Sequence, residues 1–220
     1  MSGEYHVTTL VTGGTWKQNC YLLRHVVTGE LAIVDPGADE LLIAQSVRDS
    51  GGLLRYILLT HAHHDHVGAV ASLAREFGVA AHVHRADVRL LHHAPMYAMR
   101  FANRRIDMPA PYLVLDEQPG IRLGGRRIEV IPTPGHSSGS VCYVTGGTVF
   151  TGDTLLFEHV GRVDLPGADA QQIKASVDRL IQQLSPETII LPGHGKPWNV
   201  GEARKWWAQT SVAARSVGAE

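Results

Sequence analysis

Histidine is the residue type that stands out in this sequence, with 13 copies among 220 residues. An isolated histidine is most often a surface or core residue, so only grouping and spacing point to chemistry. Two features meet that condition, a dense cluster in the segment 60–66 and three single residues further along the chain. The candidate residues are His61, His63, Asp65, His66, His136, Asp153 and His194.

Each candidate residue or cluster follows a segment that has the composition of a buried strand. The preceding apolar segments are 56–59, 128–131, 148–150 and 188–191, and Pro-Gly turns separate two of them from His136 and His194. We expect the four strands to end at the same edge of a sheet, where their polar side chains would meet in one crevice.

Imidazole and carboxylate are good ligands for zinc, and also for iron and manganese. In a tight turn, His61 and His63 can face one metal ion while Asp65 and His66 face another. The two oxygens of Asp153 can bridge the pair, and two divalent ions roughly 3.5–4 Å apart can share a hydroxide of near-neutral pKa. The pattern therefore predicts a dinuclear centre of two divalent ions, with zinc favoured, and we assign Asp65 a catalytic role as well.

The remaining elements are predicted from hydrophobic periodicity and turn residues. We expect further strands over 5–11, 19–25, 30–34, 79–83 and 140–144, and helices over 38–49, 67–77, 85–93, 169–184 and 202–215. Residues 94–120 contain four prolines and are predicted to be irregular, with Met96, Tyr97, Met99 and Phe101 as an apolar wall over the site or a local core. No repeat or linker is apparent, so residues 1–220 are predicted to form one domain.

Six motifs resemble those of the metallo-β-lactamase superfamily. They are Asn19-Cys20-Tyr21, Asp35-Pro36-Gly37, Thr60–His66, Thr133–Gly139, Thr151–Leu155 and Leu191–Gly195. The resemblance implies an α/β fold, a four-layer αββα sandwich with a dinuclear site at one edge. It also implies that His61, His63 and His136 hold the first metal, that Asp65, His66 and His194 hold the second, and that Asp153 bridges them.

Within the superfamily the chain looks most like the short glyoxalase II-like hydrolases, and glyoxalase II cleaves hydroxyacyl-glutathione thioesters. Gly161-Arg162 lies where glyoxalase II has Gly-Lys, so Arg162 is a candidate for binding a glutathione carboxylate; an ion pair with Asp164 or Glu158 is the alternative. Two departures weaken the assignment. Asp164 replaces an aromatic residue of glyoxalase II, and only 26 residues follow His194, too few for its helical C-terminal domain.

Bulk composition excludes several other functions. The net charge is −1 and the pI about 6.9, which gives no basic field for nucleic acid. No run approaches the roughly 18 apolar residues of a membrane span, and the N-terminus lacks a signal-peptide pattern, so we expect a cytoplasmic protein. The expected partner is a small molecule such as a glutathione conjugate, and the sequence leaves the oligomeric state open.

The leading hypothesis is hydrolysis of a thioester by attack of a metal-bound hydroxide on the carbonyl carbon. A thiol has a pKa near 8.5, so this leaving group needs little protonation. One alternative is a mono-iron persulfide dioxygenase, which shares the fold and the Gly-Arg-x-Asp segment. Another is a lactonase or other ester hydrolase of the same fold. A binding module without catalysis is least favoured, because it has no use for a complete hydroxide-generating site.

Overall fold

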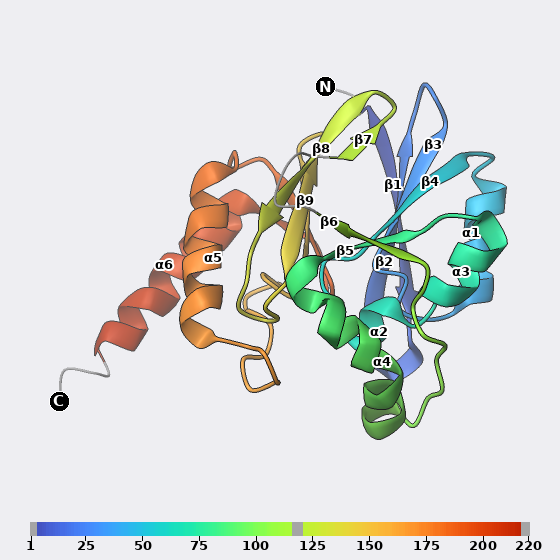
Figure 1. Cartoon of the computed structure of the whole chain (residues 1–220). Helices are drawn as coiled ribbons and strands as arrows, with labels where there is room; N and C mark the ends of the chain where they lie inside the picture. The colour runs from blue at the N-terminus through green and yellow to red at the C-terminus, as the bar shows by residue number, and fades with distance from the viewer. Residues whose placement is uncertain (1–3, 116–120, 217–220) are drawn as a thin grey trace.

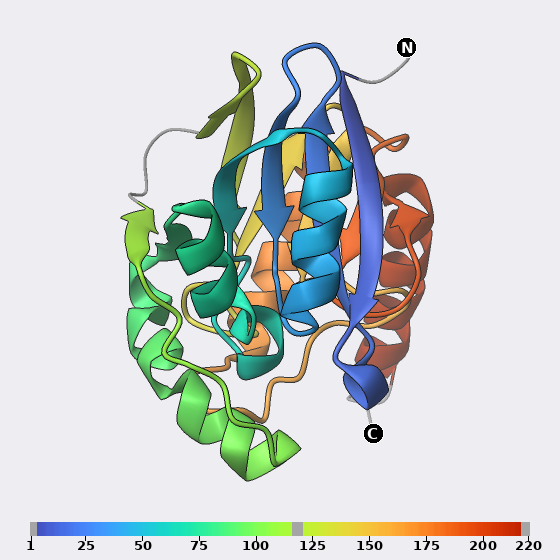
Figure 2. The ribbon, with the colours of Figure 1, turned by 90° about the vertical axis from the view of Figure 1, so that its right-hand side faces the viewer.

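The computed structural model describes residues 4–115 and 121–216, with side chains described as far as residue 210. Two six-stranded sheets pack face to face, and helices cover the outer face of each sheet. In Figure 1, α5 and α6 lie on one side of the sheets while α1 and α3 lie on the other. Figure 2 views the molecule from the side of α1 and α3. The four-layer αββα sandwich implied by the motifs is confirmed.

The first sheet is built from the N-terminal half of the chain. Its order is β1-β2-β3-β4-β5-β6, antiparallel from β1 to β3 and parallel from β3 to β6. The strands are β1 (Tyr5–Thr12), β2 (Gln18–His25), β3 (Glu30–Val34), β4 (Leu53–Leu58), β5 (Ala81–His84) and β6 (Tyr112–Leu115). The helical segments of this half are η1 (Gly14–Trp16), α1 (Glu40–Asp49), α2 (His64–Val67), α3 (Val70–Phe77), η2 (Arg85–Asp87) and α4 (Val88–Ala102).

The second sheet has the order β12-β11-β10-β9-β8-β7, and only β10 and β11 run parallel. Its strands are β7 (Ile121–Leu123), β8 (Arg126–Pro132), β9 (Val141–Thr145), β10 (Thr148–Gly152), β11 (Ile189–Pro192) and β12 (Trp198–Asn199). Helices α5 (Ala170–Gln183) and α6 (Val200–Ser216) cover its outer face. Trp198 and Trp206 contact each other within this outer core, as expected from packing of the last helix.

The alternation of side chains along each strand explains the layers, because successive residues of a strand point to opposite faces. On β3, Leu31 and Ile33 pack in the core beneath α1 and α3, whereas Ala32 and Val34 pack in the core between the two sheets. Buried apolar residues on both faces account for the continuous hydrophobic run of this strand.

The prediction of an irregular segment over residues 94–120 is confirmed for residues 103–111 and is wrong for residues 94–102 and 112–115. Helix α4 continues to Ala102 with Pro95 inside it, and β6 extends the first sheet by pairing with β5. Leu91, Ala94 and Ala98 lie on one buried face of α4, and this packing outweighs the hydrogen bond lost at the proline. Residues 116–120, the end of the predicted segment, lie outside the described residues.

Among the residues that the structure describes, no helix is both long enough and apolar enough to cross a membrane.

Candidate metal centre

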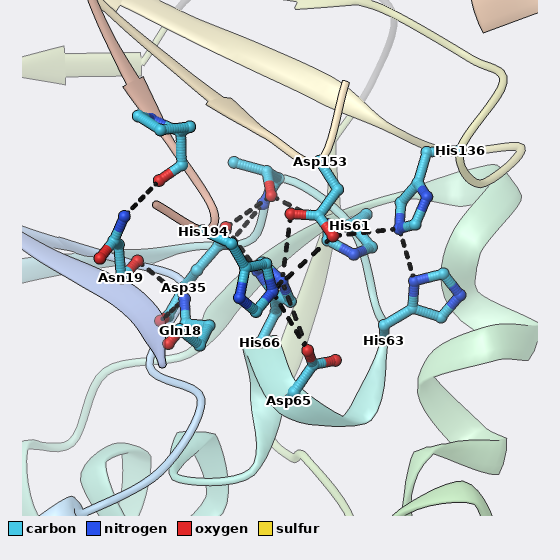
Figure 3. Close-up of polar contacts among 12 residues, drawn as sticks. Gln18, Asn19, Asp35, His61, His63, Asp65, His66, His136, Asp153 and His194 are labelled. Carbon is cyan, nitrogen blue, oxygen red and sulfur yellow. Dashed lines mark hydrogen bonds and ion pairs between the residues drawn. The ribbon is translucent and has the colours of Figure 1, made fainter. Parts of the chain in front are cut away.

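The structure brings all seven candidate residues together at one end of the sandwich (Figure 3). They do not come from one sheet, as the sequence led us to expect, but from both. His61 and His63 follow β4 of the first sheet, and α2 carries Asp65 and His66. The second sheet supplies the others after β8, β10 and β11, in the order His136, Asp153, His194. The site therefore spans the edges of both sheets.

The first group consists of His61, His63 and His136, whose ring nitrogens lie within 4.8 Å of one another. His63 Nδ1 is 2.9 Å from His136 Nε2. The ring of His61 lies 4.8 Å, centroid to centroid, from each of the other two rings. Three imidazoles from two separate loops thus converge on one point, which is the arrangement of a three-histidine metal site.

The second group consists of Asp65, His66 and His194. His194 Nε2 is 3.3 Å from both His66 Nε2 and Asp65 Oδ2. Asp153 lies between the two groups, since its Oδ2 is 3.5 Å from His136 Nε2 while its Oδ1 is 3.6 Å from His66 Nε2. A carboxylate in this position can contact ions held by either group.

The histidine nitrogens that face away from the cluster are also held. Nδ1 of His61 contacts Thr60 Oγ1 at 3.1 Å, and Nδ1 of His136 lies 2.9 Å from the carbonyl oxygen of Arg162. Nδ1 of His194 lies 3.0 Å from the carbonyl oxygen of Trp16. Such outer contacts fix the orientation of an imidazole and leave its Nε2 lone pair directed inward, as is typical of metal-binding histidines.

Asp35, which the sequence analysis named only as part of a family motif, organises the centre. Its Oδ2 lies 3.0 Å from Nδ1 of His66 and accepts a hydrogen bond from the Thr60 hydroxyl, while its Oδ1 accepts from the Thr60 backbone N–H. The side chain is almost fully buried. An acidic residue directly after the apolar strand 30–34 is the same signal that identified Asp153, and it could have identified Asp35.

Asp87 is a second residue that the sequence did not single out, and it joins the two histidine loops of the first group. One of its oxygens accepts hydrogen bonds from the Ala62 N–H and the Ser137 hydroxyl, and the other accepts from the Gly139 N–H. Burial raises the pKa of Asp87, and these three donors oppose that shift. The carboxylate positions the loop of His61 and His63 against the loop of His136.

Polar contacts also fasten the His194 turn to the first sheet. The side-chain amide of Asn19 on β2 donates to the carbonyl oxygens of Pro192 and Gly195, and the Tyr21 hydroxyl donates to Pro192 as well. Gly193 is needed for close approach rather than for a positive φ, because a Cβ there would lie 2.3 Å from Asp153 Oδ1.

The donor set fits divalent metal ions. His61 Nε2 and Asp153 Oδ1 are buried atoms without a hydrogen-bond partner, and buried polar atoms are normally paired. Burial lowers the pKa of His63 to about 3, so this imidazole is neutral and keeps its lone pair. Burial also disfavours the His66 cation, but Asp153, Asp65 and Asp35 outweigh it and raise the pKa of His66 to about 10. These carboxylates favour positive charge at the centre of the cluster.

A cavity of about 540 Å³ opens over the centre, with His63, Asp65, His136, Asp153 and His194 in its floor. Its apolar lining includes Trp16, Leu90, Tyr97, Phe101, Leu156 and Leu165. Tyr97 and Phe101 thus contribute to the predicted wall, whereas Met96 and Met99 are about half exposed and do not line the cavity. His64 belongs to none of the possible metal-binding groups, and its ring packs against Trp16 and Phe101.

Arg162 lines the same cavity, and its side chain forms a two-pronged ion pair with Asp164. Arg162 Nε and Nη2 donate to the two carboxylate oxygens at 2.9 and 2.8 Å, and both side chains are about two-thirds exposed. Its carbonyl oxygen is the group that contacts His136. The adjacent Gly161 permits this contact, because a Cβ there would lie 2.6 Å from His136 Nδ1. The segment therefore has a structural role in addition to any contact with substrate.

Comparison with known proteins agrees with this geometry. The sequence model of the metallo-beta-lactamase superfamily matches residues 13–194, a range that contains every candidate residue. The chain is 31% identical over 194 residues to hydroxyacylglutathione hydrolase GloC of Haemophilus influenzae, covering 86% of this chain and 91% of that protein. It is 28% identical over 179 residues to a probable polyketide biosynthesis zinc-dependent hydrolase, PksB of Bacillus subtilis, covering 81% and 73%.

Solved structures extend the comparison. The chain superimposes with a TM-score of 0.84 and 30% identity on BLEG-1, a B3 metallo-beta-lactamase, covering 91% of this chain and 97% of that one. A di-iron-bound form of TTHA1623 matches with a TM-score of 0.80 and 37% identity, covering 90% and 97%. ETHE1 from Myxococcus xanthus matches with a TM-score of 0.74, 23% identity and coverage of 90% and 81%, a likeness of fold alone.

Proposed function

The chain belongs to the metallo-beta-lactamase superfamily, and from that premise we propose that it is a dinuclear metal-dependent hydrolase of thioesters such as hydroxyacyl-glutathione. The observation that carries the proposal is the position of Asp153 between two groups of metal-binding side chains, one holding three histidines and the other holding Asp65, His66 and His194.

We assign one ion to His61, His63 and His136, a second ion to the group of Asp65, and the bridge to Asp153. Zinc is the favoured metal, with iron or manganese as alternatives. Two bound divalent ions would supply a Lewis acid for the carbonyl oxygen and a lowered pKa for the attacking water. The outer contacts of His61, His66, His136 and His194 prepare the ligands for this role by holding each ring in one orientation.

The residues of the cavity supply the rest of the chemistry. Asp65, which faces the cavity and the cluster, would help to orient the attacking water through its carboxylate. Trp16, Tyr97 and Phe101 exclude bulk water from the reacting carbonyl and give its acyl group an apolar surface. The leaving thiolate needs no proton donor at neutral pH to depart, which suits a thioester better than an unstrained amide.

Glutathione is proposed as the thiol on two grounds, the similarity to GloC and the presence of Arg162 in the cavity wall. The guanidinium of Arg162 is exposed enough to reach a substrate carboxylate, although it must share its donors with Asp164 or release that residue. Arg162 is therefore proposed to tune substrate affinity and not the chemical step.

The decisive test is a substrate panel run on metal-loaded protein. We expect hydrolysis of S-lactoylglutathione and other thioesters, with release of free thiol and no consumption of oxygen. The panel includes a lactone and a β-lactam, since BLEG-1 is a B3 metallo-beta-lactamase, and glutathione persulfide with oxygen uptake recorded. If the lactone or the β-lactam is hydrolysed faster than every thioester, the protein is a lactonase or a β-lactamase and not a thioesterase. Oxygen uptake by protein that holds one iron ion per chain would mean that the protein oxidises sulfur and does not act as a hydrolase.

A further inference from the structure

A second and larger cavity, of about 660 Å³, adjoins the catalytic cavity. The linings of the two cavities share Thr15, Trp16, His64 and Asp65, so the cavities lie side by side. The far wall of the second cavity comes from α3, the end of α4 and the residues that follow it. We call it the arginine cavity, because Arg75, Arg104 and Arg105 line it.

The three arginines differ in how their charges are satisfied. Arg75 donates to Asp107 at 2.9 Å and is engaged in that ion pair. Arg104 is half-buried, and its described contact is a hydrogen bond of 3.3 Å from Nη1 to the carbonyl oxygen of Gly37. Within the described part of the chain, neither Arg104 nor Arg105 has a carboxylate within ion-pair distance. A half-buried guanidinium with one weak partner retains most of its donors for a ligand.

Most of the acidic residues that line the arginine cavity already have a hydrogen-bond or ion-pair partner. Asp39 accepts a hydrogen bond from the Gly13 N–H, and Asp107 pairs with Arg75. Asp65 is directed toward His194 in the metal centre. Glu40 is the acid that has no partner in the described residues, so two uncommitted arginines face one uncommitted carboxylate. The lining carries four carboxylates against three arginines, so a preference for an anion must come from the unpaired donors of Arg104 and Arg105 and not from net charge.

We propose that Arg104, with Arg105 beside it, binds an anionic group on the leaving half of the substrate while the acyl half occupies the apolar catalytic cavity. This inference rests on the proposed thioester hydrolysis and deepens it. A half-buried guanidinium gains more from a carboxylate or phosphate than Arg162 does, because Arg162 is exposed and already paired with Asp164. The anion can be a carboxylate, as in glutathione, or the phosphate of a pantetheine carrier.

The test compares one acyl group on three thiols, with kcat/KM measured for each. Lactoyl thioesters of glutathione, of pantetheine 4′-phosphate and of neutral N-acetylcysteamine are assayed with the parent and with Arg104→Gln. We expect the variant to lose about ten- to a hundredfold on a charged thioester and less than twofold on the neutral one. A larger loss of kcat/KM on the glutathione thioester identifies the bound anion as a carboxylate, and a larger loss on the pantetheine 4′-phosphate thioester identifies it as a phosphate.

Two further variants serve as controls for the effect of Arg104→Gln. Arg48→Gln is the matched control, because Arg48 is an arginine of α1 that pairs with Glu76 outside both cavities, and it should leave all three values unchanged. Arg104→Lys keeps the charge without the planar fork of donors and should give an intermediate loss. An equal loss on neutral and charged thioesters in either Arg104 variant would overturn the proposal and reduce Arg104 to a structural partner of Gly37.

A binding measurement separates this proposal from the proposed function. Titration calorimetry with S-methylglutathione and S-methylated pantetheine 4′-phosphate, which cannot be hydrolysed, reports the anion site without turnover. If the parent hydrolyses no thioester, the proposed function fails, yet a tenfold weaker binding to Arg104→Gln would still establish the site. Equal binding to parent and variant would overturn the site whatever the activity.

Discussion

The metal centre and the walls of the two cavities above it are built on different principles. In the centre, the candidate ligands follow strands or lie on the short helix α2, and most are fixed by a second contact, as His66 is by Asp35 and His136 by the carbonyl oxygen of Arg162. In the walls, Trp16, Phe101 and Arg162 are substantially exposed, and they come from loops and from one end of α4. The difference separates a rigid region suited to the chemistry from an adaptable region suited to substrate choice.

The largest effect is expected at the link between the two metal groups. Asp153→Ala should reduce turnover to background and weaken binding of both metal ions, because one carboxylate would neutralise two cations. Elemental analysis measures the metal content of the variant, and an assay of thioester hydrolysis measures its turnover. Asp49→Ala, which removes an exposed carboxylate of α1 that bonds to Gln45, should change neither. Two tightly held ions and near-normal turnover in the Asp153 variant would disprove the bridge.

A smaller but still large effect is expected at Asp87. Asp87→Ala removes the acceptor of three buried hydrogen bonds, so the free energy of unfolding should fall by about 3 kcal/mol. Turnover should drop about ten- to a hundredfold as the loops of the first group lose their mutual position.

Urea unfolding and metal affinity are the measurements for Asp87. Asp169→Ala is the matched control, because it also removes a carboxylate that accepts backbone hydrogen bonds, at the start of α5. It should lower the stability slightly, through loss of the cap of α5, and leave the metal affinity unchanged. A destabilised Asp87 variant with unchanged metal affinity would show that Asp87 supports the fold alone.

In the walls the effect should depend on the substrate. Phe101 lines the catalytic cavity and stacks on Tyr97, with centroids 5.8 Å apart. Phe101→Ala should lower kcat/KM for a hexanoyl thioester relative to an acetyl thioester by roughly tenfold, which corresponds to about 50 Å² of lost apolar contact. Met99→Ala, on the same helix but outside the cavity, should leave the ratio unchanged. An equal loss on both thioesters would remove Phe101 from acyl recognition.

The smallest expected effect concerns the exposed ion pair of Arg162. If Arg162 binds a substrate carboxylate, Asp164→Asn frees its donors and should lower KM for S-lactoylglutathione by no more than about fivefold, because an exposed ion pair is weak. The neutral N-acetylcysteamine thioester is the control and should show no change. A raised KM for both substrates would mean that the pair only holds the loop that contacts His136.

The same contrast between centre and walls explains what the sequence could predict. The convergence of the seven candidate residues was predictable because each residue or cluster follows an apolar strand directly or after a short turn, and strand ends in an α/β fold converge. The division of those strands between two sheets was not, because strand composition does not specify which strands pair. Asp87 carried no signal, since it is a single acid between a strand and a helix whose three donors come from distant segments.

The walls were predicted least well, because their structure depends on tertiary packing. Pro95 indicated an irregular segment, although the spacing of Leu91, Ala94 and Ala98 was already that of a helix face. Arg162 was singled out by its motif, yet its guanidinium is paired with Asp164. Arg104 has no motif and is notable only because the fold leaves it half-buried beside the metal centre without a carboxylate partner.

The most direct test of the central claim is the number of metal ions per chain. Protein saturated with zinc and freed of loosely bound metal should contain two ions by elemental analysis. His194→Ala should retain one ion in the group of three histidines. A firm stoichiometry of one in the parent, unchanged in His194→Ala, would contradict a dinuclear centre bridged by Asp153.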